Sequence, residues 1–279
     1  MKTDKSRRRT LDTVERLAAV STLIASLELL ARPRIHDDAN LMSWQVSQLR
    51  SRRLLRGPIG RVFAHLLAIR MFRALLAFRV LGSLGLILGI VSGWKARAVK
   101  TTMAVSAFPV TLRSPYGWDG ADQMSAITSV TLAARSWLPE IEPAVQRFFA
   151  LQLCLSYLAS GVAKANSPEW RSGSALTGIA GTEMYGNEEF YRWLQRHPSL
   201  AVLATRGVIV AECAFPLVLI APRRLRHAIL LCGILFHAVV ARMMGLNTFF
   251  WSFVAVYPAL ENYCRSRETE IEEKGLARE

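Results

Sequence analysis

The side chains with the clearest chemical meaning lie at the end of the most apolar stretch of the chain. Residues 148–162 read FFALQLCLSYLASGV, and a lysine follows almost at once. Four polar residues recur along this stretch at intervals of four: Gln152, Ser156, Ser160 and Lys164. On a helix this spacing gives one slowly turning polar face. Because polar atoms are costly in hydrocarbon, we expect this face to line a bundle interior or a wet cavity.

Lys164 then stands at the outer end of the polar face. Burial in a partly dry pocket lowers the pKa of an amine, so Lys164 can act as a general base. In its cationic form the same group can pair with an oxyanion. The simpler alternative is that Lys164 extends to the lipid headgroups and does no chemistry.

Two further apolar segments each contain an ionisable residue. His237 lies in ILFHAVV, and Glu212 lies in the apolar segment before it. Arg206 shares that segment but is six residues away, so it does not share a helix face with Glu212. We expect Glu212 to find its partner on another helix, with Lys164 and His237 as candidates. His237 is predicted to be either catalytic or a hydrogen-bonded core residue.

Two connecting segments also contain candidates. In YGWDGADQM, Asp119 and Asp122 are placed to cap the next helix, and capping is the favoured role of Asp122. Residues 165–199 are predicted to be a loop containing scattered aromatic residues, Trp170 among them. Such residues suit a membrane-interface belt, or else a lid over the bundle mouth.

Composition indicates a membrane protein. The chain has 279 residues, of which 52% are hydrophobic, and its net charge is +14. The apolar residues gather into blocks near the roughly 20 residues that cross a bilayer. We therefore predict an all-α, polytopic membrane bundle with about eight spans and a possible range of six to eight. The segments are 13–31, 72–93, 97–112, 122–137, 145–164, 200–221, 227–244 and 247–263.

The basic residues predict the orientation of the spans. Residues 1–12 form a basic cytoplasmic start, 13–263 a single transmembrane domain, and 264–279 a charged tail, also cytoplasmic. Counting the spans alternately places the arginine-rich segment 32–71 outside, although basic segments usually lie on the cytoplasmic side. Either the first helix does not cross, or this segment lies on the membrane surface. The predicted location is the bacterial cytoplasmic membrane, with the lipid bilayer as partner.

Several classes of function are disfavoured. No stacking aromatics alternate with the basic runs, so no nucleic-acid partner is expected. The four cysteines have no zinc spacing, so no metal is expected. No internal repeat is found, which argues against a transporter.

The run LSYLASGVAKANSPEWRSGSAL resembles the signature of the HTTM (horizontally transferred transmembrane) domain, the membrane module of vitamin K-dependent γ-carboxylases. That signature reads approximately as Gly-x-x-Lys, then a polar spacer, Trp, two residues and Gly. The matching positions are Gly161, Lys164, Trp170 and Gly173. GADQM, with Asp122, and the Phe-His pair at His237 resemble two more family features in the same order.

The resemblance implies that Lys164 holds the position of the base that deprotonates vitamin K hydroquinone or another membrane quinol. Oxygenation then gives a stronger base, which removes a γ-proton from a peptide glutamate before carbon dioxide adds. By the same resemblance His237 holds a position that lines the site. Asp122 is a third site position, with a weaker match. Gln152, Ser156, Ser160, Trp170 and Glu212 are the expected supporting residues. A separately encoded peptide or protein is the implied substrate.

Two departures from the carboxylases limit the comparison. Carboxylases have paired lysines where this chain has Ala163 and Lys164, and they carry a large extramembrane portion. The leading hypothesis is a carboxylase-like lyase or quinol-oxidising membrane enzyme. The alternative is a non-catalytic membrane protein that assists maturation or assembly of a partner.

Overall fold

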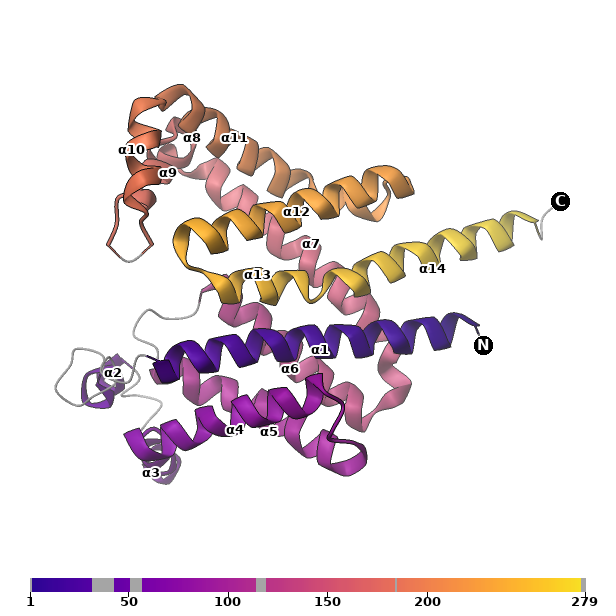
Figure 1. The fold of residues 1–279 in the computed structure, drawn as a ribbon. Coiled ribbons are helices and arrows are strands. Elements are labelled where there is room, and N and C mark those ends of the chain that lie inside the picture. Colours follow the sequence, from indigo (N-terminus) through magenta and orange to yellow (C-terminus); the bar gives the residue numbers. More distant parts are fainter. Residues whose placement is uncertain (1, 32–42, 51–56, 114–118, 184, 277–279) are drawn as a thin grey trace. The chain divides into compact units, whose positions relative to one another are not determined.

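The protein is built from helices. The computed structural model describes residues 2–31, 43–50, 57–113, 119–183 and 185–276, and within these ranges all regular structure is helical (Figure 1). The all-α prediction is confirmed. The chain divides into two compact units, one formed by Met1–Arg7 with Gln146–Glu279 and the other by Arg8–Val145.

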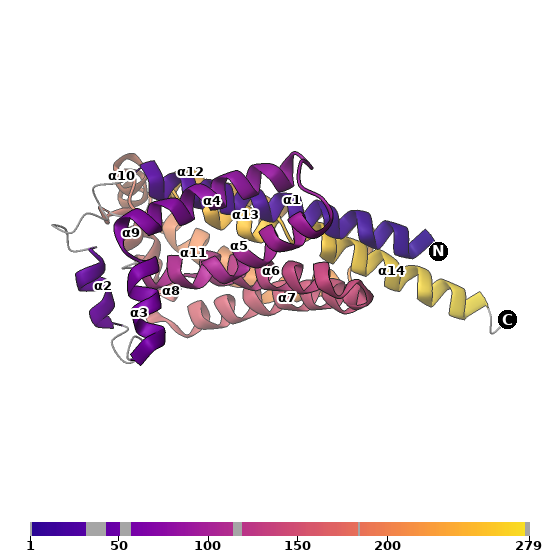
Figure 2. The same ribbon diagram turned by 90° about the horizontal axis from the view of Figure 1, so that it is seen from below.

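The Arg8–Val145 unit is a group of helices that come one after another along the chain. Its elements are most of α1 (Lys2–Ala31), α2 (Trp44–Arg50), α3 (Gly57–Leu66), α4 (Ile69–Ile87), α5 (Gly93–Arg113), α6 (Gly120–Trp137) and the 3-10 turn η2 (Pro139–Ile141). α4 and α5 form a helical hairpin (Figures 1 and 2). A Cβ at Gly82 would lie 2.9 Å from the Met103 side chain, so the glycine lets the two helices approach closely.

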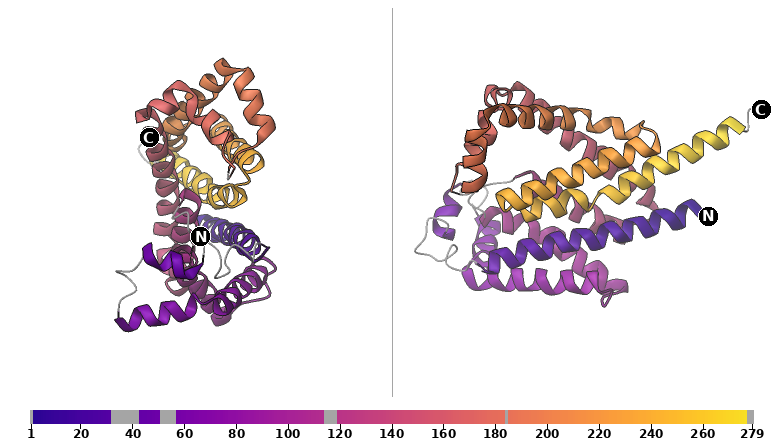
Figure 3. Two further views of the ribbon diagram at one scale, coloured as in Figure 1. Left: turned by 90° about the vertical axis from the view of Figure 1, so that its left-hand side faces the viewer. Right: turned by 45° about the horizontal axis from the view of Figure 1, so that its top comes forward.

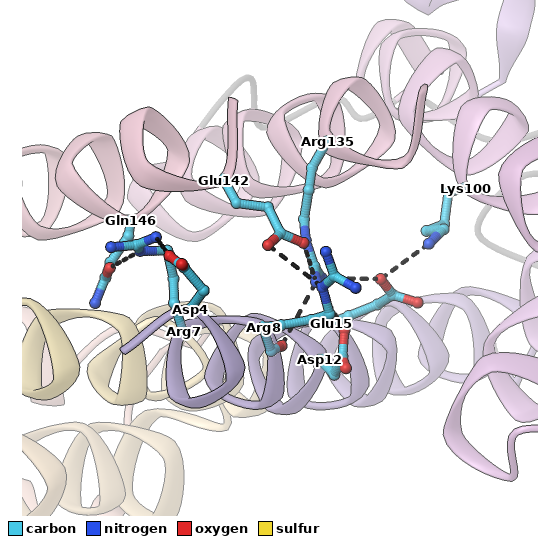
Figure 4. Close-up of polar contacts among 9 residues, drawn as sticks. All are labelled: Asp4, Arg7, Arg8, Asp12, Glu15, Lys100, Arg135, Glu142 and Gln146. Carbon is cyan, nitrogen blue, oxygen red and sulfur yellow. Dashed lines mark hydrogen bonds and ion pairs between the residues drawn. The ribbon is translucent and has the colours of Figure 1, made fainter. Parts of the chain in front are cut away.

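An ion network joins α1, α5, α6 and the start of α7 within this unit (Figure 4). Its centre is the buried Arg135, which contacts Glu142 and Asp12, both at 2.9 Å, and Glu15 at 3.8 Å. Lys100 contacts Glu15 at 3.0 Å. Each buried charge in the network therefore has a charged partner, as a low-dielectric interior requires.

The other unit contains the long helix α7 and the helices between it and the carboxyl end. Its elements are α7 (Glu142–Asn166), α8 (Pro168–Ser172), α9 (Ser174–Ala180), α10 (Glu188–Arg196), α11 (Pro198–Ala214), the 3-10 turn η3 (Phe215–Leu219), α12 (Arg223–Met244), α13 (Asn247–Val254) and α14 (Tyr257–Leu276). The short helices α8, α9 and α10 gather beside the start of α11 (Figures 1 and 3). α12 and α13 pack as a second hairpin.

Polar side chains also fix the first turns of α1 within this unit. Arg7 Nε donates to Gln146 Oε1 at 2.9 Å, as Figure 4 shows. Gln146 Nε2 donates to Asn262 Oδ1 at 2.6 Å, and Asn262 Nδ2 donates to Ser6 Oγ at 2.9 Å. This chain of amides joins α1, α7 and α14.

A second ionic contact joins α14 to the start of α12. Arg226, buried at the start of α12, donates to Glu261 at 2.7 Å and to Glu268 at 2.6 Å. The hydrogen bond from Arg226 lowers the pKa of the Glu268 carboxyl. A lowered carboxyl pKa adds stability at neutral pH, and that contribution is lost as the pH falls through the lowered value.

The predicted loop 165–199 is largely helical instead. Ser167 caps α8 by accepting a hydrogen bond from the Trp170 amide, and Asn187 caps α10 in the same way from the Phe190 amide. Pro168 occupies the first turn of α8, where its missing N–H costs nothing. These local start signals begin α8 and α10, and α9 begins at Gly173 without a side-chain cap. Length and apolar periodicity did not reveal these three short helices.

The structure supports three candidate membrane spans instead of eight. Three helical segments are long and apolar enough to cross a bilayer: Pro139–Asn166, Pro198–Leu219 and Arg223–Met244. Each of the eight predicted segments does coincide with helical residues. Charge accounts for α1, α4 and α5, which each contain three or more ionisable residues, whereas α6 contains two but is too weakly apolar, and α13 has 8 residues. Inserting such helices in hydrocarbon is costly.

Parts of the segment 32–71 lie outside the described residues, namely 32–42 and 51–56. α2 and α3 are the described helices within it, and Leu49 of α2 is exposed. The choice between a surface helix and a first helix that does not cross stays open. The single domain 13–263 and the cytoplasmic termini also stay predictions.

The ion network gives a first test. Arg135→Met removes the principal partner of the buried Glu142, while Arg8 remains 3.6 Å from that carboxylate. We expect the free energy of unfolding to fall by about 2 kcal/mol, less than the ~3–5 kcal/mol of a fully orphaned buried charge. Thermal unfolding in detergent, followed by circular dichroism, measures the effect. Adding Glu142→Gln should recover part of the loss, and the exposed Arg147→Met is the control. Equal loss in single and double variants would contradict the assignment.

Candidate functional site

The candidate site is built on one face of α7. Tyr157, Gly161 and Lys164 come at intervals of four and three residues, which places them on one helical stripe. Tyr157 and Gly161 are buried, and Lys164 is half-buried. Two clusters of polar side chains form along this stripe, one around Lys164 and one around Tyr157.

Lys164 forms a sheltered ion pair with Glu212 of α11. Lys164 Nζ lies 2.9 Å from Glu212 Oε1 and 2.7 Å from Oε2, and it donates to Ser160 Oγ at 2.5 Å. The two side chains are 17% and 7% exposed, so water screens the pair weakly. Three oxygen atoms surround Nζ, which matches the three hydrogens that an ammonium group can donate.

Trp170 covers the ammonium group. Lys164 Nζ lies 5.0 Å from the centre of the Trp170 ring, within the range of a cation–π contact. The capped helix α8 fixes this ring, and Gly173 ends the helix with φ +84°. A Cβ at Gly173 would meet the Val202 backbone nitrogen at 2.9 Å, so both conformation and space require glycine.

Gly161 allows α7 and α11 to touch. A Cβ at this position would lie 2.7 Å from the backbone nitrogen of Cys213, 2.8 Å from its Sγ and 3.0 Å from Glu212 Cβ. A real Cβ cannot approach that closely, so the two helices would have to separate. Gly161 thus sets the helix spacing at which Lys164 reaches Glu212.

A second cluster joins three helices by hydrogen bonds. Tyr157 Oη of α7 lies 2.7 Å from His237 Nε2 of α12 and 2.5 Å from Tyr257 Oη of α14. All three side chains are buried. Gly233 makes room for them, because a Cβ there would lie 2.2 Å from Tyr257 Oη.

The burial of His237 Nδ1 favours one placement of the protons in this cluster. His237 Nδ1 is buried and has no hydrogen-bond partner among the described residues. A buried N–H without an acceptor is more costly than a bare lone pair, so the imidazole proton belongs on Nε2. His237 then donates to Tyr157, and Tyr157 donates to Tyr257. Nδ1 is left as an acceptor.

Aromatic rings enclose this second cluster. The Phe215 ring stacks on Tyr157 with centroids 3.8 Å apart, and the Phe253 ring stacks on His237 at 4.7 Å. Phe249 lies 5.4 Å from the imidazole. The apolar surroundings keep water from His237, so its hydrogen bond to Tyr157 does not compete with solvent.

The other predicted site residues have separate positions. Gln152 and Ser156 are half-buried, and Gln152 Nε2 donates to Ser156 Oγ at 3.3 Å. The fully buried side of α7 instead includes Phe149 and Leu153. The predicted polar face of α7 therefore lies next to the buried side. Asp122 belongs to the other compact unit, where its backbone N–H is capped by Asp119 Oδ1 at 2.8 Å. The capping carboxylate there is that of Asp119.

Sequence reasoning missed the two tyrosines. Tyr157 lies seven residues before Lys164, a spacing that places both on one face, and Tyr257 directly precedes Pro258. Neither the spacing of Tyr157 nor the position of Tyr257 was specific enough to predict a contact between a tyrosine and His237. Among the described residues, no group of three His, Cys, Asp or Glu side chains can hold a metal ion.

The fold and the site define a helical protein whose three candidate membrane spans each carry one of Lys164, Glu212 and His237. No family model matches the chain. No solved structure matches it. The chain is similar to an uncharacterized protein of Bacillus subtilis, YitO, with 26% identity over 161 residues. The match covers 56% of this chain and 49% of YitO, so this chain spans about half the length of that relative.

The contact at Gly161 gives the second test. In a helix Gly→Ala normally stabilises by about 1 kcal/mol. Gly161→Ala should instead destabilise, because the new Cβ meets the Cys213 backbone. Gly207→Ala on α11 is the matched control, since no atom lies within 4 Å of its Cβ. The midpoint of thermal unfolding should fall for Gly161→Ala and stay level or rise for Gly207→Ala. A rise in both would refute the close helix contact.

The tyrosine–histidine chain gives the third test. In protein with ¹⁵N-labelled histidine, His237 should show the neutral form protonated at Nε2, with its resonance assigned from a His237→Gln variant. Tyr157→Phe leaves that N–H without an acceptor and should lower the free energy of unfolding by about 1–3 kcal/mol. Tyr191→Phe on α10 is the control. A proton found on Nδ1 would disprove the proposed hydrogen-bond order.

Proposed function

We propose that the chain is a membrane protein of the HTTM type that binds a quinol at the Lys164–Glu212 pair, with an activity like that of vitamin K-dependent γ-carboxylases. The observation that carries the proposal is the ion pair itself. It is sheltered from water, and it joins two helices that are each apolar enough to cross a membrane. Ionisable groups in such helices are costly and are typically retained for function.

The residues present suit a lipid-soluble ligand with a weakly acidic hydroxyl group. Lys164 supplies a cation, Glu212 supplies acceptor oxygens, and Trp170 supplies an apolar ring at the same point. When bound, a quinol supplies the acidic hydroxyl and the reducing electrons. Four signature positions of the resemblance, Gly161, Lys164, Trp170 and Gly173, each have a physical role in forming this arrangement.

The geometry refines the expected role of Lys164. A lysine with all three hydrogens donated is the ammonium form, so it is not a free base at rest. Glu212 can accept a proton at Oε2, while Lys164 keeps a positive charge beside the donor atom. In this arrangement Lys164 stabilises negative charge, and Glu212 is the base.

The same contacts, in which every Lys164 hydrogen has an acceptor, also suit a second function. A fully satisfied ion pair can serve as a fixed link between α7 and α11 without chemistry. Under this alternative the chain assists maturation or assembly of a partner protein. The proposed location is the bacterial cytoplasmic membrane, and the proposed bundle includes the more polar helices besides the three apolar spans.

A double substitution that removes both charges of the Lys164–Glu212 pair distinguishes the enzyme from the structural link. Lys164→Ala exposes a lone buried carboxylate and risks unfolding, so the principal variant is Lys164→Gln with Glu212→Gln, which retains polar side chains without charge. For a quinol enzyme, purified protein should bind vitamin K hydroquinone and catalyse its oxidation by dissolved oxygen above the spontaneous rate. The double variant should remain folded and lose at least a hundredfold of that rate, consistent with a lost charge at the reacting atom.

The control is Arg171→Gln, an exposed cation close to the same site. Circular dichroism confirms folding of each variant. If wild-type protein neither binds nor oxidises the hydroquinone, the enzyme proposal fails and the linking role replaces it. Equal turnover in wild type and the double variant would remove Lys164 and Glu212 from the reaction.

A further inference from the structure

The turn that joins α4 to α5 presents large apolar side chains outward (Figure 1). Leu88, Ile90 and Trp94 are 65%, 73% and 72% exposed. A single exposed apolar residue is ordinary, whereas several that lie together mark a contact site for a membrane or another molecule. This turn is therefore a candidate interaction surface.

The conformation of the turn directs these side chains outward. Val91 folds back on α4, where a Cβ at Gly85 would meet its Cγ1 at 3.3 Å. The amide nitrogens of Ile90 and Val91 both donate to the Gly85 carbonyl, at 3.0 Å and 3.3 Å. Gly89, with φ +68°, lets the chain reverse at this point. Because the turn places Val91 on the inside, Ile90 beside it faces away from the unit.

A second group of exposed apolar side chains lies beside the turn, at the end of α6. Trp137 and Leu138 are both exposed. The indole N–H of Trp137 donates to Thr101 Oγ1 at 2.9 Å, and the Arg97 guanidinium lies 5.6 Å from the centre of the Trp137 ring. Arg97 is one helical turn after Trp94 on α5, so the two groups meet at one end of the unit. We call the five residues the apolar tip: Leu88, Ile90, Trp94, Trp137 and Leu138.

Positive charge accompanies the apolar tip. Lys95 and Arg97 are exposed at the start of α5, and the sequence of residues 57–113 contains no aspartate or glutamate. Along the chain, the exposed carboxylate nearest to Trp137 is Glu140. Anionic lipid surfaces attract basic residues, and tryptophan settles at the level of the headgroups. The combination of side chains therefore fits an anionic lipid surface.

The place of the tip in the chain supports the same partner. Trp137 and Leu138 directly precede Pro139, the first residue of a candidate membrane span. The end of a span lies where the headgroups meet the acyl chains, and tryptophan is enriched there. Because Thr101 and Arg97 contact Trp137, the start of α5 lies at the same level as this end of the span.

We propose that the apolar tip is a membrane-interface anchor that binds anionic phospholipids in one leaflet. Leu88, Ile90 and Trp94 enter the boundary between headgroups and acyl chains, and Lys95 and Arg97 contact the lipid phosphates. The inference rests on the membrane location in the proposed function, and it does not depend on any chemistry at the Lys164–Glu212 pair.

Fluorine NMR of the full chain tests the anchor. The chain, labelled with fluorotryptophan, is placed in nanodiscs of equal parts phosphatidylcholine and phosphatidylglycerol, and the Trp94 resonance is assigned from Trp94→Phe. Nitroxide-labelled phosphatidylglycerol should broaden that resonance about twofold more than nitroxide-labelled phosphatidylcholine does. Broadening by a water-soluble paramagnetic chelate alone would overturn the proposal. A resonance shielded from both reagents would place protein, such as a second copy of the chain, on the tip and would also overturn it.

Charge variants test the preference for anionic lipid. Lys95→Gln with Arg97→Gln should bring the ratio of the two broadenings to about one, because a neutral amide is not attracted to the negative leaflet. The matched control is Arg223→Gln with Arg224→Gln, which removes two exposed cations at the start of α12 and should leave the ratio at Trp94 unchanged. A ratio that stays the same without Lys95 and Arg97 would refute their contact with lipid phosphate.

Extraction of membranes with alkaline carbonate separates the anchor from the membrane location itself. If the chain stays in the membrane while Trp94 responds only to the aqueous chelate, the location holds and the anchor fails. If carbonate releases the chain, the proposed spans fail, and the broadening of Trp94 by labelled lipid still decides whether the tip binds the membrane surface.

Discussion

The close contact between α7 and α11 is the constraint on which the candidate site depends. Gly161 has no side chain, and a Cβ at that position would lie 2.7 Å from the Cys213 backbone nitrogen. The helices therefore meet closely enough for Lys164 to reach both oxygens of Glu212. Trp170 then covers the ammonium because Ser167 and Gly173 fix the short helix between them. The ion pair at this position depends on backbone spacing as much as on the lysine.

Charge compensation organises the interior of both units. Arg135 is matched by Glu142 and Asp12 in one unit, and Arg226 by Glu261 and Glu268 in the other. Burial in low dielectric makes an unpaired charge expensive, so these pairs join helices that are distant in sequence. Arg79 of α4 differs from these two arginines, because its hydrogen-bond partners are two hydroxyl groups and a carbonyl.

The four positions on which the resemblance to the HTTM signature rests have distinct physical roles in this chain. Gly161 and Gly173 are positions of close approach, Lys164 is held in an ion pair, and Trp170 covers the cation. These roles support a defined kind of site without assigning its substrate. The same fully satisfied contacts also suit a rigid link between helices, which is why function has to be decided by removing the charges together.

The sequence by itself determined the helical class, the approximate helix positions and the ionisable residues of the three apolar spans. Apolar length, periodicity and charge are local properties, and they are readable along one segment. Only the tertiary structure decided that Glu212 pairs with Lys164, 48 residues away, and that His237 and Tyr257 meet Tyr157 across 80 and 100 residues. Partner choice depends on distances between packed helices, and no local pattern encodes those distances.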